Sequence, residues 1–314
     1  MTSKHPNRSG LVGFALLVAA LTLVRIGYGV MTVPQSAVVP LQILSAIIFI
    51  VGPIYAIKAG SSHAWKPAHA WAIFLLGVGI HAGCGVSLAR FLPEFGLGTV
   101  IVQSLGQAGL LAWCLGLGAI VAGLLKDKNL MLPVAFFLAG FDMFLVFNPT
   151  AITAQIVTSR PQVFQSVAAT IPNAVSERVS EGMSVVPMAF VGPADLFISA
   201  VFFVCLYRFG MRTKETGRWL AVALVGYLIL VLAPLGLNML PALVPIGATV
   251  LIVNWREWKL NAEEKQATIG VACIALALAS YGLYRRLNTP PVAPGPSSDV
   301  PVTSESAPTP SPVP

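Results

Sequence analysis

Long apolar runs separated by short polar connections dominate this chain of 314 residues. A helix needs about 20 apolar residues to cross the hydrocarbon of a bilayer. Nine runs approach or reach that length, so the pattern predicts nine membrane-spanning helices. Their approximate bounds are 11–31, 37–57, 70–90, 99–125, 130–148, 185–208, 218–237, 240–255 and 268–285. The predicted fold class is therefore an all-α polytopic membrane protein.

Two regions depart from this pattern and set the predicted organisation. Residues 149–184 form a polar connection rich in Ser, Thr and Val, and residues 288–314 are mostly Pro, Ser, Val and Thr. A tail of that composition cannot bury a core, so we expect it to be disordered. Four regions follow from these breaks: a four-helix membrane region over 1–129, a second membrane region over 130–255, a final helix over 256–287 and the tail over 288–314.

The composition supports the membrane assignment and indicates which kinds of partner the protein has. The chain is 56% hydrophobic and 10% charged, with a mean hydropathy of +0.81, far too apolar for a soluble protein of this size. Its net charge of +7 comes from basic residues in short loops rather than one patch. The lipid bilayer is therefore a predicted partner, and nucleic acid is not. The four cysteines all lie in apolar runs without a CxxC pair, and no metal or cofactor is predicted.

The distribution of Lys and Arg predicts the orientation. With the N-terminus inside, the inner segments hold 13 Lys and Arg residues and the outer segments hold 5. This asymmetry favours a cytoplasmic N-terminus and an extracytoplasmic 149–184 loop. The first apolar run is too long for the core of a signal peptide and lacks a clear cleavage site, so we expect a retained first helix. These features are compatible with a prokaryotic inner membrane.

Asp142 and Asp195 are the only two of the 12 acidic residues that lie inside apolar runs. A carboxylate near the bilayer centre costs about 2.5–3.5 kcal/mol on insertion scales. The two predicted helices are consecutive and antiparallel, and both carboxylates come out about 9–12 Å from the same membrane face at 1.5 Å per residue. A pair in contact shares a proton and can activate a water for hydrolysis. Intramembrane carboxylates also serve carriers, so a proton-coupled or other carboxylate-based transporter stays open.

Three short segments occur in an order that resembles a known family. The first, around Asp142, reads FDMFLVFNPT, the second, around Asp195, reads GPADLFISAVFF, and the third is Pro241-Ala242-Leu243. Together they resemble the two catalytic segments and the Pro-Ala-Leu signature of the presenilin and signal peptide peptidase family. These are GxGD-type intramembrane aspartyl proteases. The resemblance covers about residues 130–255.

The resemblance implies a presenilin-like fold and an activity. A protease of this family cleaves transmembrane helices or signal-peptide remnants, with Asp142 and Asp195 as the catalytic pair. The neighbouring positions implied to support the site are Phe141, Gly192, Pro193, Ala194, Pro241, Ala242 and Leu243.

The chain departs from the family at three of these positions. Phe141 stands where the family usually has Tyr, and Ala194 stands where it has Gly. Pro193 is unusual beside the second aspartate and is predicted to kink or unwind the span there. A non-catalytic homologue that binds membrane helices therefore stays open as a further alternative.

The long loop carries candidate strands. The family's way of opening a substrate helix implies pairing of the unwound substrate with an enzyme edge. Residues 152–157 (ITAQIV) alternate and are β-branched, and 184–186 form a second short run. We expect these to order on substrate binding, although a plain surface loop is an equal alternative.

Polar residues elsewhere in the spans receive simpler predictions. Arg25 lies near the end of the first span, and its side chain is expected to reach the headgroup region. Gln103 and Gln107 share one helix face and are expected to bond to neighbouring helices.

Overall fold

The structure is a computed structural model that describes residues 9–91, 96–148, 151, 167–172, 175–176, 189–232 and 241–288. The predicted strand runs at 152–157 and 184–186, and the tail beyond residue 288, lie outside the described residues.

The described chain is mainly helical, as predicted, and each predicted apolar run overlaps one described α-helix. The α-helices are α1 (Ser9–Val30), α2 (Gln35–Ser61), α3 (Pro67–Phe91), α4 (Leu97–Leu124), α5 (Met131–Phe147), α8 (Pro193–Arg208), α9 (Thr213–Leu232), α10 (Leu243–Val253) and α11 (Ala262–Asn288). Two short 3-10 helices, Lys128–Leu130 and Trp255–Glu257, precede α5 and follow α10.

Six of the described helices are long and apolar enough to cross a membrane: α1, α2, α3, α4, α11 and the unit Lys128–Phe147 that contains α5. This is compatible with an integral multi-pass membrane protein. Helices α8 and α10 are shorter, with 16 and 11 residues, or about 24 and 16 Å against a hydrocarbon core of about 30 Å. Helix α9 carries charge in its first two turns, at Lys214, Glu215 and Arg218.

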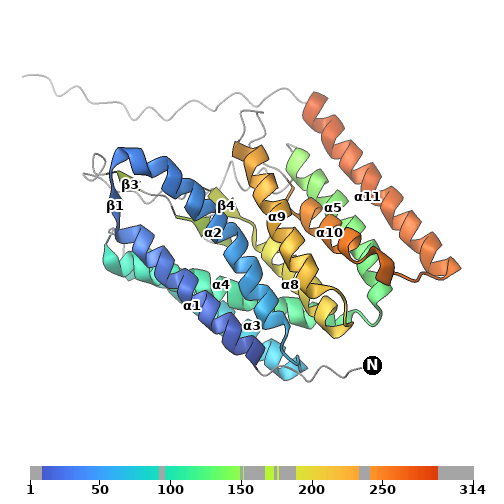
Figure 1. Cartoon of the computed structure of the whole chain (residues 1–314), viewed down its shortest axis with the longest axis horizontal. Helices are drawn as coiled ribbons and strands as arrows, with labels where there is room; N and C mark the ends of the chain where they lie inside the picture. The colour runs from blue at the N-terminus through green and yellow to red at the C-terminus, as the bar shows by residue number, and fades with distance from the viewer. Residues whose placement is uncertain are drawn as a thin grey trace, which may run out of the picture.

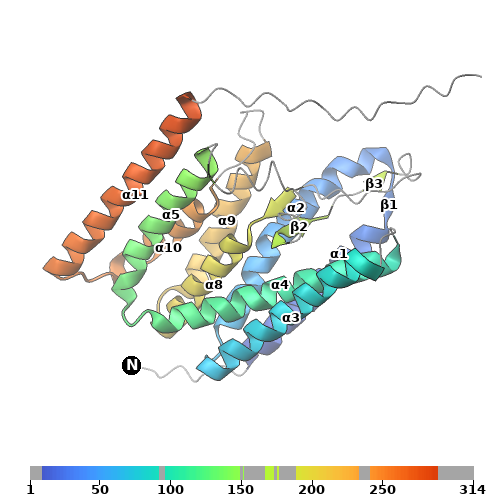
Figure 2. The same cartoon turned by 180° about the vertical axis from the view of Figure 1, so that it is seen from behind.

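Helix α8 is the centre of the bundle. Residues Ile198 to Leu206 are all buried, because the helix is apolar on every face and a helix of that kind belongs in a core. It contacts α4 and α2 of the first region and α10 and α9 of the second. Figure 1 shows α8 between the α1–α2 side and the α5–α11 side, and Figure 2 shows α3 and α4 from behind.

Four short strands accompany the helices. Strand β2 (Ala169–Ile171) pairs antiparallel with β4 (Ala189–Val191), with Thr170 opposite Phe190. Strand β1 (Thr32–Val33) pairs parallel with β3 (Val175–Ser176). The sixth predicted span, 185–208, is therefore wrong at its start: residues 189–191 are extended, and the helix begins at Pro193.

Helices α3 and α4 approach each other through glycines. A Cβ added at Gly77 would lie 2.3 Å from the Trp113 nitrogen, and one at Gly116 would lie 2.4 Å from the Phe74 nitrogen. Contacts this short leave no room for a side chain. In a membrane, where helices gain little from hydrophobic burial, such close backbone packing is a main source of association.

Replacing Gly77 with Ala should separate α3 from α4. Overpacking of this kind costs about 1–3 kcal/mol, so the thermal unfolding midpoint of the purified protein in detergent should fall. Gly79→Ala is the matched control, because it lies in the same helix and its Cβ would meet nothing within 4 Å. Equal unfolding temperatures for the two variants would contradict this packing.

Candidate active site

Asp142 lies on α5 five residues before the helix ends at Phe147, and it contacts the start of α10. Its Oδ2 accepts a hydrogen bond of 2.8 Å from the backbone N–H of Leu243. Leu243 is the first residue of α10, so this N–H is one of the donors that a helix leaves without an internal partner. The carboxylate satisfies it and lies at the positive end of the helix dipole. Asp142 and the Pro-Ala-Leu segment are thus in direct contact.

Asp195 lies in the first turn of α8, immediately after the strand β4. Gly192 is the N-cap residue of this helix and Pro193 its first residue. The Asp195 N–H bonds to the Gly192 carbonyl at 3.1 Å. A Cβ added at Gly192 would lie 3.0 Å from Oδ2 of Asp195, so glycine leaves one side of this carboxylate open.

Of the two effects predicted for Pro193, a kink or an unwound span, the structure shows no kink inside a helix, while the predicted span is extended over Ala189–Val191 just before Pro193. Proline removes a helical hydrogen bond only in a helix interior, and in the first turn its N–H would have no partner in any case. Pro193 therefore starts α8 and lets the chain pass from extended backbone into the helix beside Asp195. Its carbonyl accepts a contact of 3.6 Å from the Cys114 thiol of α4.

Three ionisable groups from three helices gather here. The charge of Asp142 acts on Asp195, and both aspartates act on the phenol of Tyr227 on α9. Residues 53 positions apart in sequence therefore lie within electrostatic reach, inside an apolar bundle where charges interact more strongly than in water. The three groups therefore influence one another's charge state.

Tyr227 is a site residue that the sequence reasoning missed. Its hydroxyl donates a 2.7 Å hydrogen bond to the carbonyl of Pro241. The Pro241–Leu243 turn is thereby held from both sides, by Tyr227 through a carbonyl and by Asp142 through an N–H. A lone tyrosine in an apolar span was the available signal, because a buried phenol needs a partner.

Phe141 and Ala194 differ from the other predicted support residues. The Phe141 ring stacks with Phe137 at 5.7 Å and with Phe144 at 6.3 Å, in a row on α5 that continues to Tyr281 of α11. Ala194 is exposed. Gly192 and Leu243, by contrast, lie directly against the two carboxylates.

A polar clamp holds the strand pair that leads into Asp195. Arg25 donates to the hydroxyl of Thr170 at 2.8 Å and to its carbonyl, and its guanidinium lies 4.6 Å from the ring centroid of Phe49. Gln107 accepts from the Thr170 N–H at 3.2 Å and donates to the Ala168 carbonyl at 3.3 Å. We call Arg25, Gln107 and Thr170 the β2 clamp.

The β2 clamp changes two predictions. Arg25 does not extend to the headgroup region but turns inward to bond with Thr170. Gln107 bonds to the segment around β2 rather than to a neighbouring helix. The physical reason is that extended backbone at membrane depth is tolerated only where protein groups satisfy it. Since β2 pairs with β4, the clamp fixes the strand that ends at Val191, one residue before Gly192.

In the described ranges, no three or more His, Cys, Asp or Glu side chains come together as a metal site would need. Comparison with models of protein families, with curated proteins and with solved structures gave no match.

Replacing Arg25 with Ala should destabilise the protein. The change removes both donors to Thr170, and a buried acceptor left without a donor costs about 1–3 kcal/mol. We expect a lower unfolding temperature in detergent and faster proteolysis in the region of residues 167–172. Arg90→Ala is the control, since Arg90 is exposed in the last turn of α3. Unfolding unchanged by Arg25→Ala would contradict the clamp.

Proposed function

We propose that this protein is an intramembrane aspartyl protease that hydrolyses peptide bonds within transmembrane helices or signal-peptide remnants. One observation carries the proposal: the Asp142 carboxylate of α5 accepts a hydrogen bond from Leu243 at the start of α10, and its charge reaches Asp195 at the start of α8. These are the three segments on which the resemblance to the presenilin and signal peptide peptidase family rests.

In the proposed mechanism, the two carboxyl groups share one proton and bind a water between them. The ionised group removes a proton from the water, and the protonated group polarises the peptide carbonyl. The Leu243 N–H occupies Oδ2 of Asp142, which leaves Oδ1 for the water. No covalent intermediate is required.

The backbone beside Asp195 supports a way to bind an unwound substrate. Strand β4 ends one residue before Gly192 and pairs with β2 along one edge. An extended peptide that adds to the sheet at β4 would place its carbonyls beside Asp195. The absence of a side chain at Gly192 leaves room for that approach.

The proposal also includes the architecture and orientation. Nine spans in a presenilin-like arrangement, a cytoplasmic N-terminus and an extracytoplasmic 149–184 loop fit the helix order and the distribution of basic residues. Both aspartates lie near the ends of their helices that flank this loop. Substrates would then enter from the bilayer with their N-terminus inside.

A carboxylate-based carrier is the second candidate function. The observation that favours it is Arg25, a cation within the first span, which borders two cavities of about 20 Å³ each. Each is large enough for a water, so a polar path past Arg25 would suit transport. Proton or solute flux into liposomes separates the two candidates, since a protease needs none.

Replacing either aspartate with Ala should abolish proteolysis. Loss of a general acid or base lowers the rate by about 10²–10⁴-fold. The measurement is cleavage of a model transmembrane peptide by the purified protein in detergent, with products identified by mass spectrometry. Glu263→Gln, an exposed acid at the start of α11, should cleave normally. Full cleavage by Asp142→Ala or Asp195→Ala would rule out the protease. A wild-type protein that retains the peptide without cutting it would indicate a non-catalytic homologue.

Replacing Tyr227 with Phe should slow cleavage without unfolding the protein. The change removes the anchor of the Pro241 carbonyl, which is worth about 1 kcal/mol, and a fivefold lower kcat is about that energy. Because the turn supports the carboxylates, we expect KM to change less than kcat. Tyr284→Phe is the control, since that ring is 61% exposed at the end of α11. An unchanged kcat for Tyr227→Phe would contradict a role of the Pro241–Leu243 turn in catalysis.

A further inference from the structure

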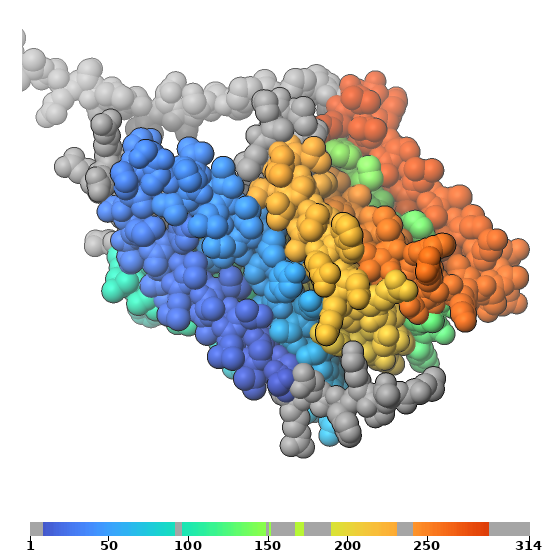
Figure 3. All heavy atoms as spheres, viewed as in Figure 1, coloured from blue at the N-terminus to red at the C-terminus, as the bar shows by residue number. Residues whose placement is uncertain are grey.

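A groove of about 700 Å³ runs between α9 and α10, away from the aspartates. Its α9 side has residues spaced by three, four and seven positions, which places them on one helix face. Ten residues line it: Arg212, Glu215, Trp219, Val222, Ala223, Thr249, Ile252, Val253, Trp255 and Arg256. Figure 3 shows α9 and α10 side by side on the face toward the viewer.

The groove is divided into a charged end and an apolar end. Arg212, Glu215 and Arg256 lie where α9 begins and α10 ends. Val222 and Ala223 lie about two turns further along α9, toward the middle of the bundle, and Ile252 lies in the last turn of α10. This sequence of charged, then apolar lining matches the order of headgroup and acyl chain in one leaflet.

The charged end belongs to a basic, aromatic membrane face. Trp219 and Trp255, which are 60% and 65% exposed, lie between the charged and apolar parts, where indole rings collect at membrane interfaces. At the same end of the bundle, Lys58 lies within electrostatic reach of Lys214, Glu215 and Arg218. The groove therefore opens at the level of lipid headgroups.

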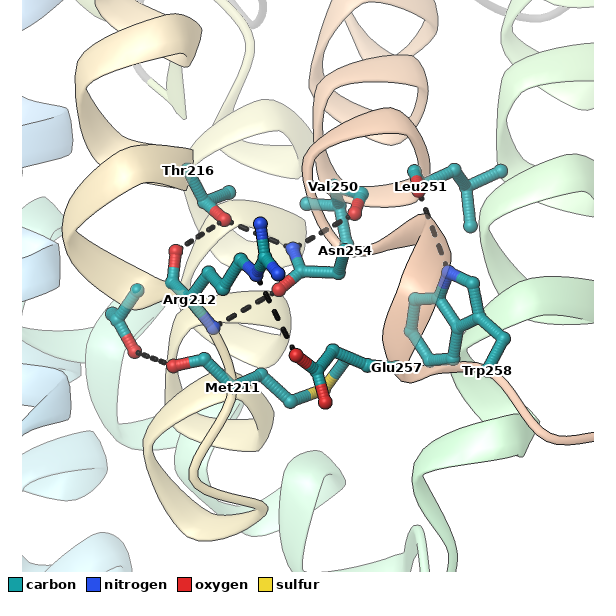
Figure 4. A network of polar contacts seen from close by, with 9 residues as sticks. Met211, Arg212, Thr216, Val250, Leu251, Asn254, Glu257 and Trp258 are labelled. Atoms are coloured by element: carbon teal, nitrogen blue, oxygen red, sulfur yellow. Dashed lines mark hydrogen bonds and ion pairs between the residues drawn. The ribbon is translucent and has the colours of Figure 1, made fainter.

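A hydrogen-bond network makes this end rigid. Figure 4 shows Arg212 paired with Glu257 at 3.5 Å, while the Asn254 side chain accepts from the Arg212 N–H and donates to Thr216. Asn254 is fully buried, so the network ties the start of α9 to the end of α10. A preformed site of this kind loses little entropy on binding.

Some charged side chains in the groove already form an ion pair within the described part of the protein, and others do not. Arg212 is paired with Glu257. Arg256 lies over the Trp255 ring at 5.4 Å and, among the residues described, has no carboxylate within ion-pair distance. Glu215 likewise has no ion pair in the described part of the chain, although Lys58 lies within electrostatic reach. One guanidinium and one carboxylate therefore face the groove together.

We propose that this groove binds one glycerophospholipid with an amine headgroup, as in phosphatidylethanolamine. The phosphate binds the guanidinium of Arg256, and the ammonium group binds the Glu215 carboxylate. An acyl chain packs along Val222, Ala223 and Ile252. A basic groove at a membrane face would by itself favour an anionic lipid, but a carboxylate in the lining repels one and complements a zwitterion. This site is independent of the proposed proteolysis.

Native mass spectrometry of the purified full-length protein tests the proposal. The protein is exposed to equal amounts of phosphatidylethanolamine, phosphatidylcholine and phosphatidylglycerol, and bound lipid is counted. Phosphatidylethanolamine should dominate. Arg256→Ala should lower its retention about tenfold, because the phosphate loses a charge-assisted hydrogen bond. Lys265→Ala removes an exposed basic residue of α11 at this face and should retain the lipid.

Glu215→Gln is the second variant and tests the headgroup assignment separately. It should shift the preference toward phosphatidylglycerol, because the carboxylate that selects the amine and repels an anionic lipid is gone. Millimolar glycerophosphoethanolamine, which lacks acyl chains, should not displace bound lipid. Stronger binding of phosphatidylglycerol by the wild type, displacement by the soluble headgroup, or full retention by a folded Arg256→Ala variant would each overturn the proposal.

Discussion

The hydrogen bond from the Leu243 N–H to the Asp142 carboxylate is the contact on which the candidate site depends. It joins Asp142, five residues before the end of one apolar helix, to the first residue of another helix that starts 101 residues later. Inside a bilayer, neither group would find water as a substitute partner. The hydrogen bond therefore satisfies both groups. It also helps to hold the start of α10 beside Asp142 on α5. Tyr227 secures the same turn from α9.

Extended backbone inside a helical bundle is the second constraint. Strands β2 and β4 satisfy part of each other's hydrogen bonding, and the β2 clamp satisfies more. Arg25 and Gln107 thus act on Asp195 through two strands rather than by touching it. The arrangement explains why the first and fourth helices carry strongly polar side chains at membrane depth, where such residues are costly.

Much of this fold follows from the sequence, because apolar runs of membrane length have few alternatives to a helix. Where the described helices lie along the chain could be predicted for that reason, and so could the position of both aspartates near the helix ends that flank the 149–184 loop. The role of Pro193 could not, since proline in an apolar run is compatible with either a kink or a helix start. Its assignment depends on β4, and β4 depends on pairing with a segment 20 residues earlier.

The hydrogen-bond partners of the polar side chains also could not be predicted from the sequence. Arg25 has a long side chain that can turn toward headgroups or toward the bundle, and only the location of Thr170 decides between these. Tyr227 needed a partner, but nothing local in the sequence identified the Pro241 carbonyl. Likewise, the resemblance placed the Pro-Ala-Leu segment near the aspartates without indicating which atom would bond.

Cross-linking in the membrane tests most directly whether the two aspartates form a pair. Asp142→Cys and Asp195→Cys are combined in a chain whose four natural cysteines are replaced by Ala, and a short bifunctional thiol reagent is applied. The structure predicts rapid linking of this pair. It predicts none for Asp142→Cys with Trp219→Cys, since residue 219 lies about 12 Å along α9 from Tyr227. A first pair that links no faster than the second would contradict the account.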